Sequence, residues 1–275
     1  MNSVKIMLIA NAGIMIEYRE QQLLVDALHE GHRLYPGTPP AAMQALLDGA
    51  PPFKEIKALV FTHNHLDHFS PRLARSVLQR YPDLDFIADE VSVAAMRTAG
   101  EETDDPFDHS RMTAMPWQLP TQTSYADGSF IRSLPPAIHK GPFSIQPLPF
   151  LHEGRGFQDV ANVGLMISVG GVHILYPGDA RISPENFAIL TRPLPPVDVA
   201  VLMFPYISTS RGQRIVREFI KPRNLVVVHW PQPEHDREKW IENAHSYYER
   251  TKDSLMQTWF LEHYLDTVGF TPSWL

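Results

Sequence analysis

The sequence predicts a layered domain of the α/β or α+β class. Three observations lead to this prediction: an ordinary globular composition, short hairpin-like strands at the start, and strands that alternate with helices later. The 275 residues are 44% apolar and 20% charged. Such a chain is long enough to bury a large core, as one large domain or two small ones. The mixture of both kinds of element indicates stacked layers of sheet and helix.

The chain begins with β-structure. Apolar or alternating runs at residues 4–10, 13–18 and 22–26 predict three short strands, separated by Gly13 and by the polar stretch 20–22. The first run ends in an Ala-Asn-Ala triplet that imitates a signal-peptide cleavage site. Because this run is very short and a second strand follows at once, two strands explain it better than a leader peptide.

Strands and helices then alternate. A helix around 40–48 follows Pro-rich turns, and the short apolar run 56–61 predicts a buried strand. Ser70 and Pro71 provide an N-cap and a first helical residue for a helix over 71–81. The remaining elements predicted here are a strand at 85–88 and a helix at 89–100, which Gly100 closes.

Residues 101–142 are the least regular part of the chain, rich in Pro, Thr, Ser and Asp. Long irregular segments in compact domains tend to be functional or disordered. Apolar runs after this segment predict strands at 143–150, 162–169, 172–177, 197–204 and 224–230. Helices near 184–191, 211–220 and 236–251 alternate with the last of these strands.

The formal net charge is −7, and the chain has no cysteine. The negative balance argues against a surface that binds nucleic acid by neutralising its phosphates. Without cysteine there is no disulfide and no thiolate nucleophile, and a metal site must use His, Asp or Glu. No apolar stretch approaches the ~20 residues of a membrane span. These properties favour a soluble, cytoplasmic protein.

The stretch THNHLDH, residues 62–68, places three histidines and an aspartate within six positions, directly after a predicted buried strand. Imidazole suits Zn²⁺, and the carboxylate adds a hard oxygen ligand. In extended backbone His63 and His65 point the same way and can hold one ion. Asp67 and His68 come where the chain turns toward the next helix, so they can face a second ion. The alternative is a solvated loop that happens to be rich in histidine.

The sequence here resembles the metallo-β-lactamase fold superfamily, whose H-x-H-x-D-H signature also follows a buried strand. The remaining ligands of that family come singly, each after a later strand: a histidine, an aspartate preceded by glycine, and a last histidine. His152 ends QPLPFLH, Asp179 lies in HILYPGDA, and His229 ends NLVVVHW. The resemblance covers nearly the whole chain, from Asp26 in LLVDA to His229.

The resemblance implies one metallo-hydrolase domain over residues 1–275, folded as an αββα sandwich of two mixed β-sheets flanked by helices. It also implies two divalent metal ions, Zn²⁺ or alternatively Mn²⁺. The implied ligands are His63, His65 and His152 for the first ion, Asp67, His68 and His229 for the second, and Asp179 for both. Asp26 would support the ligands by hydrogen bonds, with a plain turn residue as the alternative.

The implied activity is that of a dinuclear hydrolase, in which a metal-bridging hydroxide attacks a small polar ester or lactone, with or without a phosphate group. Asp67 would orient the hydroxide and handle its proton. Asp179 and the lack of cysteine argue against a true β-lactamase, and His65 argues against the redox di-iron branch. The chain resembles most the branch that includes L-ascorbate-6-phosphate lactonase-like proteins and the phospholipase that cleaves N-acylethanolamine phospholipids. This resemblance lies in two segments, IANAGIMIEYREQQLLVD and HILYPGDA.

Four residues close to the implied ligands in sequence are candidates for binding the small-molecule substrate. Arg155 and Arg211 could pair with a phosphate or carboxylate, and an exposed charge explains each equally well. Trp230 could form a pocket wall, with simple packing as the alternative. His235 could act as a general acid.

Two other interpretations of the function stay open. The chain could also form a homo-oligomer. One is a phosphodiesterase that acts on a cyclic nucleotide, a phospholipid or RNA, although the net charge makes nucleic acid a poor substrate. The other is a non-enzymatic metal-binding module. His29 and His32 are expected in a surface loop, with a loop that reaches the site as the alternative. Residues 101–142 are expected to form a lid, an insertion or an oligomer contact.

Overall fold

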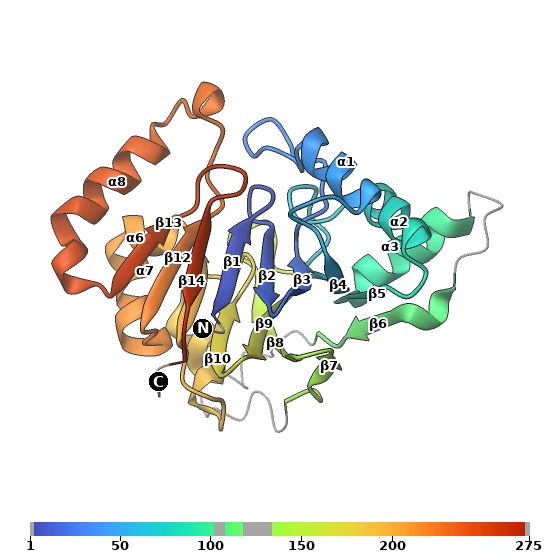
Figure 1. The fold of residues 1–275 in the computed structure, drawn as a ribbon. Coiled ribbons are helices and arrows are strands. Elements are labelled where there is room, and N and C mark those ends of the chain that lie inside the picture. Colours follow the sequence, from blue (N-terminus) through green and yellow to red (C-terminus); the bar gives the residue numbers. More distant parts are fainter. Residues whose placement is uncertain (1–2, 102–107, 118–133, 273–275) are drawn as a thin grey trace.

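The computed structural model describes residues 3–101, 108–117 and 134–272. Two seven-stranded sheets face each other, and helices cover the outer face of each sheet (Figure 1). The predicted αββα sandwich of two mixed sheets is therefore confirmed. Within the described ranges, none of the helices combines the length and apolar character that crossing a bilayer requires.

The first sheet has the strand order β14-β1-β2-β3-β4-β5-β6. Its strands β1, β2 and β3 form an antiparallel meander, β4, β5 and β6 add in parallel, and β14 pairs antiparallel with β1. The strands are Val4–Leu8 (β1), Ile14–Tyr18 (β2), Gln21–Val25 (β3), Glu55–Phe61 (β4), Asp85–Asp89 (β5), Met112–Met115 (β6) and Thr267–Phe270 (β14). Its helices are Pro40–Asp48 (α1), Pro71–Arg80 (α2) and Glu90–Glu101 (α3), with a 3-10 turn at His109–Arg111 (η1).

The second sheet has the order β13-β12-β11-β10-β9-β8-β7. Strands β7 to β10 run antiparallel, and β11, β12 and β13 add in parallel. The strands are Ile138–Lys140 (β7), Phe143–Leu151 (β8), Ala161–Val169 (β9), Val172–Tyr176 (β10), Val199–Met203 (β11), Asn224–Val228 (β12) and Gln257–Phe260 (β13). Its helical segments are Pro184–Phe187 (α5), Ala188–Thr191 (η2), Pro205–Ser208 (α6), Ser210–Ile215 (α7), Val216–Ile220 (η3), Pro233–His235 (η4), Trp240–Thr251 (α8) and Lys252–Ser254 (η5).

The core between the sheets is built from strand residues that alternate inward. Ile6 lies opposite Ile16 in the first sheet, and Ile174 lies opposite Ile167 in the second. All four belong to one buried apolar cluster that both sheets share. Two further clusters fill the spaces between each sheet and its helices. Burial on both sides explains why strands such as β11 and β12 are almost continuously apolar.

Several elements differ from the sequence prediction. Residues 101–142 were expected to be irregular, yet they contain β6 and β7, which extend one edge of each sheet. The C-terminal strands β13 and β14 were not predicted either. These strands have only three or four residues, so pairing with a sheet edge, rather than their own pattern, determines them. The proposed lid segment lies mainly in 102–107 and 118–133, outside the described residues.

Two predicted helices change type along their length. The helix expected at 184–191 becomes a 3-10 helix after Phe187, and the one at 211–220 becomes a π-helix after Ile215.

The helix expected from 236 begins at Trp240. The carboxylate of Asp236 accepts hydrogen bonds from the backbone N–H groups of Trp240 and Ile241, 2.8 and 2.9 Å away, so Asp236 precedes the helix instead of opening it.

Candidate metal centre

The seven side chains implied as metal ligands lie together at one end of the two sheets. Each follows a strand: His63, His65, Asp67 and His68 come after β4, His152 after β8, Asp179 after β10, and His229 after β12. Both sheets therefore contribute to one cluster. All but His65 and Asp179 have low residue exposure, at 6% or less.

A first group consists of His63, His65 and His152. One ring nitrogen from each lies within 4.8 Å of the others. The Nε2 atoms of His63 and His152 are 3.3 Å apart. Three imidazoles converging in this way are typical of a zinc-like coordination site.

A second group consists of Asp67, His68 and His229, whose ligand atoms also lie within 4.8 Å of one another. The Nε2 atoms of His68 and His229 are 3.1 Å apart, and Nε2 of His229 lies 3.6 Å from Oδ2 of Asp67. This group combines two imidazoles with one carboxylate, a donor set that also accepts harder ions.

Asp179 lies between the two groups. Its Oδ1 is 3.3 Å from Nε2 of His68 and 3.5 Å from Nε2 of His229. Its Oδ2 is 3.7 Å from Nε2 of His152 in the first group. Oδ1 is buried and accepts no hydrogen bond from the described residues. A buried carboxylate oxygen in this position needs a cation to compensate its charge.

Three of the histidines are held by their Nδ1 atoms, which leaves Nε2 facing the centre. Nδ1 of His63 lies 3.0 Å from Oγ1 of Thr62, and Nδ1 of His152 lies 2.6 Å from the carbonyl oxygen of Glu153. Nδ1 of His68 lies 2.9 Å from Oδ2 of Asp26. Such partners orient metal-binding imidazoles and fix their tautomers.

Asp26 is fully buried, and both of its carboxylate oxygens are engaged. Oδ1 accepts from the backbone N–H of Thr62 at 2.7 Å, and Oδ2 accepts from the Thr62 hydroxyl at 2.6 Å. Oδ2 also accepts from the hydroxyl of Tyr176 at 3.1 Å. Asp26 follows β3, Thr62 follows β4 and Tyr176 ends β10, so this carboxylate joins the two sheets beneath His68.

Gly178 determines the position of Asp179. Its φ is +59°, and a Cβ at this position would lie 2.5 Å from Oδ1 of Asn162 and 2.9 Å from Oγ1 of Thr62. Only glycine fits without displacing these groups. The same Asn162 Oδ1 accepts a hydrogen bond from the backbone N–H of Asp179, 3.1 Å away.

Burial and neighbouring charges shift the titration of the cluster. Burial lowers the pKa of His63 well below its usual value and lowers the pKa of His65 to about 4. It lowers the pKa values of His152 and His229 in the same direction. These imidazoles are therefore neutral near pH 7, the form that binds metal.

His68 and Asp179 behave as an ion pair. Burial lowers the pKa of His68, but the charges of Asp179 and Asp26 outweigh burial and raise it well above the usual value. Burial raises the pKa of Asp179, but His229 and His68 outweigh burial and hold it well below the usual value. In the absence of metal, the proton on His68 compensates the buried carboxylates. A divalent ion would replace that proton, so these residues fit metal.

Comparison with solved structures shows what kind of fold carries this cluster. The chain aligns with the metallo-β-lactamase fold protein YhfI from Bacillus subtilis at a TM-score of 0.60 and 12% identity, over 98% of this chain and 100% of that one. The chain has the metallo-β-lactamase fold.

Two further structures share the metallo-β-lactamase fold with this chain. Igni18, a metallo hydrolase from the archaeon Ignicoccus hospitalis, aligns at a TM-score of 0.60 and 14% identity, over 98% of both chains. The isothiocyanate hydrolase from Delia radicum gut bacteria aligns at 0.60 and 16% identity, over 97% of this chain and 99% of that one. No protein-family model matches the sequence, and no curated protein matches it.

The two arginine candidates lie in different places. Arg155 is exposed in the loop after β8, between His152 and Phe157. The ring of Phe157 contacts the imidazoles of His65 and His152, with centroids 4.9 and 5.2 Å away. Arg211 is exposed in α7, a helix of the outer layer, and among the described residues no contact joins it to the seven ligands.

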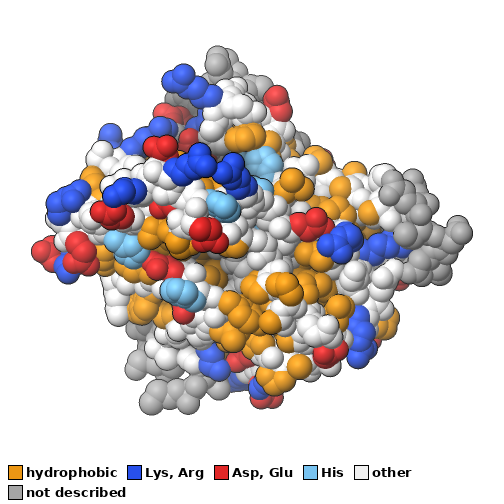
Figure 2. Space-filling view, turned by 90° about the horizontal axis from the view of Figure 1, so that it is seen from above, with side chains coloured by type: hydrophobic (Ala, Val, Ile, Leu, Met, Phe, Trp, Pro, Cys, Tyr) orange, Lys and Arg blue, Asp and Glu red, His pale blue; other side chains and the backbone are white. Residues whose placement is uncertain are grey.

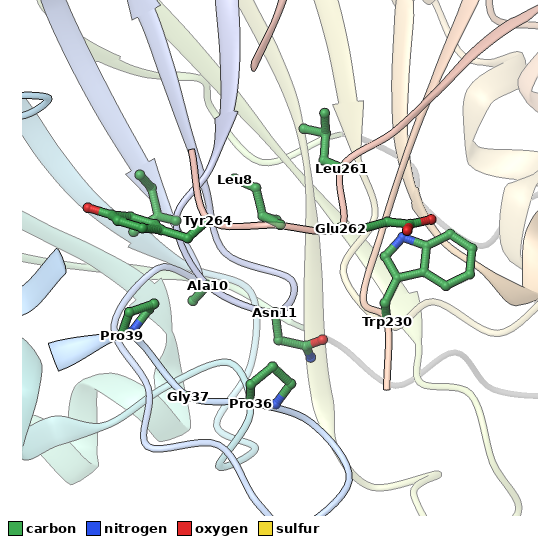
Figure 3. A pocket seen from close by; sticks show the side chains of 11 residues that line it. Leu8, Ala10, Asn11, Pro36, Gly37, Pro39, Trp230, Leu261, Glu262 and Tyr264 are labelled. Atoms are coloured by element: carbon green, nitrogen blue, oxygen red, sulfur yellow. The ribbon is translucent and has the colours of Figure 1, made fainter. Parts of the chain in front are cut away.

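Trp230 is buried behind the centre. Its ring stacks between Phe204 and His245, with centroids 5.5 and 5.2 Å away. Trp230 also lines a cavity of about 90 Å³ that contains none of the seven implied ligands. Figure 3 shows the Asn11 side chain extending toward Trp230 in this cavity. Trp230 thus packs among aromatic rings, and the backbone N–H of the preceding residue His229 donates to the carbonyl oxygen of Asn11 at 3.0 Å.

The expectation for His29 was wrong. His29 is fully buried rather than part of an exposed loop, because the chain after β3 folds back over the sheet. The backbone N–H of His29 donates to Oγ1 of Thr38, and that hydroxyl donates to the carbonyl oxygen of Ala27, both at 2.9 Å. Burial lowers the pKa of His29 to about 3, so the imidazole is neutral.

His32 and His235 lie together at the edge of the centre. The side chain of His32 is 42% exposed, and its Nε2 is 3.4 Å from Oδ2 of Asp67. Both histidines line one hollow. Tyr35, which the sequence did not single out, contacts the imidazoles of His229 and His32, with centroids 4.3 and 5.1 Å away. The loop between Asp26 and α1 has a mixed composition, so the sequence did not indicate that Tyr35 would contact these histidines.

Proposed function

We propose that this chain is a metal-dependent hydrolase that acts on a small polar ester or lactone, with or without a phosphate group. Two divalent ions, Zn²⁺ or Mn²⁺, would be held by the two groups of ligands, one by each group. The position of Asp179 carries this proposal, because its two carboxylate oxygens face different groups. The hydrolase structures that share the fold support it.

The bound ions would supply positive charge to polarise the substrate oxygen and would lower the pKa of the attacking water. Asp67 would act on that water. Burial raises the pKa of Asp67, but His68 and His229 outweigh burial and lower it, so its carboxylate is ionised at neutral pH. An ionised carboxylate here accepts a hydrogen bond from the water and orients it. Nε2 of His32, 3.4 Å from Oδ2 of Asp67, can pass the proton onward.

The rim of the centre supports a substrate with an apolar part. Phe157 is 46% exposed although its ring contacts His65 and His152. Leu66, between the ligands His65 and Asp67, is 65% exposed. Phe157 therefore presents apolar surface beside the first group of ligands, where the carbon skeleton of an ester or lactone would lie. A neutral skeleton also suits a chain with a net charge of −7 better than nucleic acid does.

A panel of substrates tests the proposal. The full chain, loaded with Zn²⁺ or Mn²⁺, is assayed on p-nitrophenyl acetate, simple lactones and bis-p-nitrophenyl phosphate. We expect hydrolysis of the ester and lactones, and loss of both metal binding and turnover in His65→Ala and Asp179→Ala. Preference for the phosphodiester would favour the phosphodiesterase alternative. Tight metal binding with no turnover of any substrate would favour a binding module, and full activity without metal would refute the proposal.

A further inference from the structure

A hollow of about 240 Å³ lies beside the second group of ligands. It is lined by His32, Arg33 and Leu34 from one loop and by His235 and Arg237 from another. Four of these five side chains carry or can carry positive charge, and none of them is acidic. Figure 2 shows Lys and Arg side chains gathered beside histidines on the face seen from above. This hollow is locally basic on a chain whose net charge is −7.

Backbone contacts hold the two loops in place. The N–H of Gln232 donates to the carbonyl oxygen of Leu34 at 2.7 Å, which joins the loops directly. The N–H of His235 donates to the carbonyl oxygen of Gln232 at 2.9 Å. The neighbouring Asp236 carboxylate accepts hydrogen bonds from the first backbone N–H groups of α8, those of Trp240 and Ile241. The basic side chains are thus displayed from a fixed frame, which lowers the cost of binding.

The two arginines lack acidic partners. Within residues 3–101, 108–117 and 134–272, neither Arg33 nor Arg237 forms an ion pair, although Arg72, Arg214 and Arg223 each pair with a carboxylate. Both guanidinium groups are exposed. They are therefore available to a ligand, and each can bind two oxygens of one oxyanion.

His32 lies between the hollow and the metal centre. Nε2 of His32 is 3.4 Å from Oδ2 of the implied ligand Asp67, while its ring also lines the hollow. The hollow is therefore one side chain away from the implied ligand Asp67. The apolar residue Phe157 contacts the opposite group of ligands, His65 and His152. The centre thus has one apolar side and one basic side.

We propose that this hollow binds a phosphate group of the substrate and so selects phosphorylated esters or lactones. The assignment rests on the proposed hydrolase function. Two guanidinium charges on joined loops match a phosphate dianion better than a carboxylate, which has one negative charge. Arg33 and Arg237 would bind the phosphate oxygens, and His235 would donate a further hydrogen bond.

Binding of inorganic phosphate tests the hollow without turnover. The metal-loaded full chain is titrated calorimetrically at low ionic strength, together with Arg33→Ala, Arg237→Ala and the control Arg250→Ala. Arg250 is exposed in α8 and lies over the ring of Tyr247, outside the hollow. We expect each change in the hollow to weaken phosphate binding about tenfold, the worth of one charge-assisted contact, and no effect in the control. Equal affinity in all four proteins would place phosphate on the metal ions alone and overturn the proposal.

A matched pair of substrates tests selectivity. Glucono-δ-lactone and its 6-phosphate differ only in the phosphate group. We expect a higher kcat/KM for the phosphorylated lactone, and loss of this preference in Arg33→Ala and Arg237→Ala with the unphosphorylated lactone unaffected. Hydrolysis of both lactones at equal kcat/KM would overturn the phosphate site and leave the hydrolase function standing. Phosphate binding that depends on the two arginines, with no hydrolysis of any substrate, would refute the hydrolase function and support the site.

Discussion

The carboxylate of Asp26 lies 2.9 Å from Nδ1 of His68, and both residues are fully buried. This pair links a residue of the first strand meander to an implied ligand of the second group. The Thr62 hydroxyl and the Tyr176 hydroxyl bond the same carboxylate oxygen, so His68 is oriented by a network that both sheets build. Four tests follow from this arrangement and from two neighbouring features.

Asp26→Asn should weaken metal binding while the chain stays folded. The amide keeps the shape of the carboxylate but presents a neutral group to His68, so Nε2 becomes a poorer ligand. Loss of such a supporting carboxylate lowers metal affinity by about 10- to 100-fold. Titration with Zn²⁺ measures the change, and Asp48→Asn, at an exposed aspartate bonded to Gln44, is the control. Unchanged affinity in Asp26→Asn would show that Asp26 does not support the site.

Metal binding should release a proton from His68. The charges of Asp179 and Asp26 raise its pKa well above the usual value, whereas burial lowers that of His65 to about 4. At neutral pH the metal-free chain therefore holds a proton on His68 but none on His65. The affinity of the second group for metal should rise as the pH rises through the neutral range, because His68 then loses its proton more easily. The metal affinity of the first group should not change in this range. Calorimetry at pH 7 in two buffers of different ionisation enthalpy counts the protons released, and equal counts for both ions would contradict this.

Gly178→Ala should destabilise the protein and displace Asp179. The positive φ and the 2.5 Å approach to Oδ1 of Asn162 together cost about 2 kcal/mol or more. We expect a lower free energy of unfolding in urea and a loss of metal binding. Gly156→Ala is the matched control, because a Cβ there meets no atom within 4 Å. Similar stability for both variants would mean that the loop at Gly178 adjusts freely.

Asp89→Asn should change how stability depends on pH. The Asp89 carboxylate is buried at the end of β5, where it accepts from the backbone N–H of Val91 and from Ser92. Burial raises its pKa from 3.8 to about 6. The folded state therefore holds this proton more tightly, and the stability it contributes below pH ~4 is lost as the pH rises through 6.

The Asp89→Asn variant has no carboxyl group at this position, so nothing titrates there. Relative to Asp89→Asn, the wild type should lose up to about 3 kcal/mol between pH 4 and pH 7. Urea denaturation of both proteins in the same metal state measures the difference, and Asp83→Asn, at an exposed position, provides the control. Parallel stability curves for wild type and Asp89→Asn would disprove the assignment.

Most of the fold could be predicted from local patterns. Strands such as β4 and β12 carry short apolar runs followed by polar residues, and Ser70 with Pro71 marks the start of α2, where the Ser70 hydroxyl accepts from the N–H of Leu73. The short edge strands β7 and β14 could not be predicted. Their residues adopt extended structure because a neighbouring strand offers free hydrogen-bonding groups, which is information that lies elsewhere in the chain.

The candidate centre was predicted mainly through its resemblance to a family, since single residues such as His152 carry little local signal. The supporting residues Thr62 and Asn162 were not singled out, because a threonine or an asparagine at a strand end has many structural uses. His29 is buried in a loop that is closed by a hydrogen bond from its backbone N–H to Thr38, nine residues later in the chain. Neither hydrophobic periodicity nor turn composition encodes a contact of this kind.

The hydrogen bond from the backbone of His229 to Asn11 has a consequence for the order of synthesis. The last ligand in the chain docks on the turn between the first two strands, so the cluster closes by joining late sequence to early sequence. A growing chain on the ribosome carries the first group of ligands as soon as His152 has emerged, but lacks one of the three residues of the second until residue 229 is made. Complete assembly of the centre is therefore delayed until most of the protein has been translated.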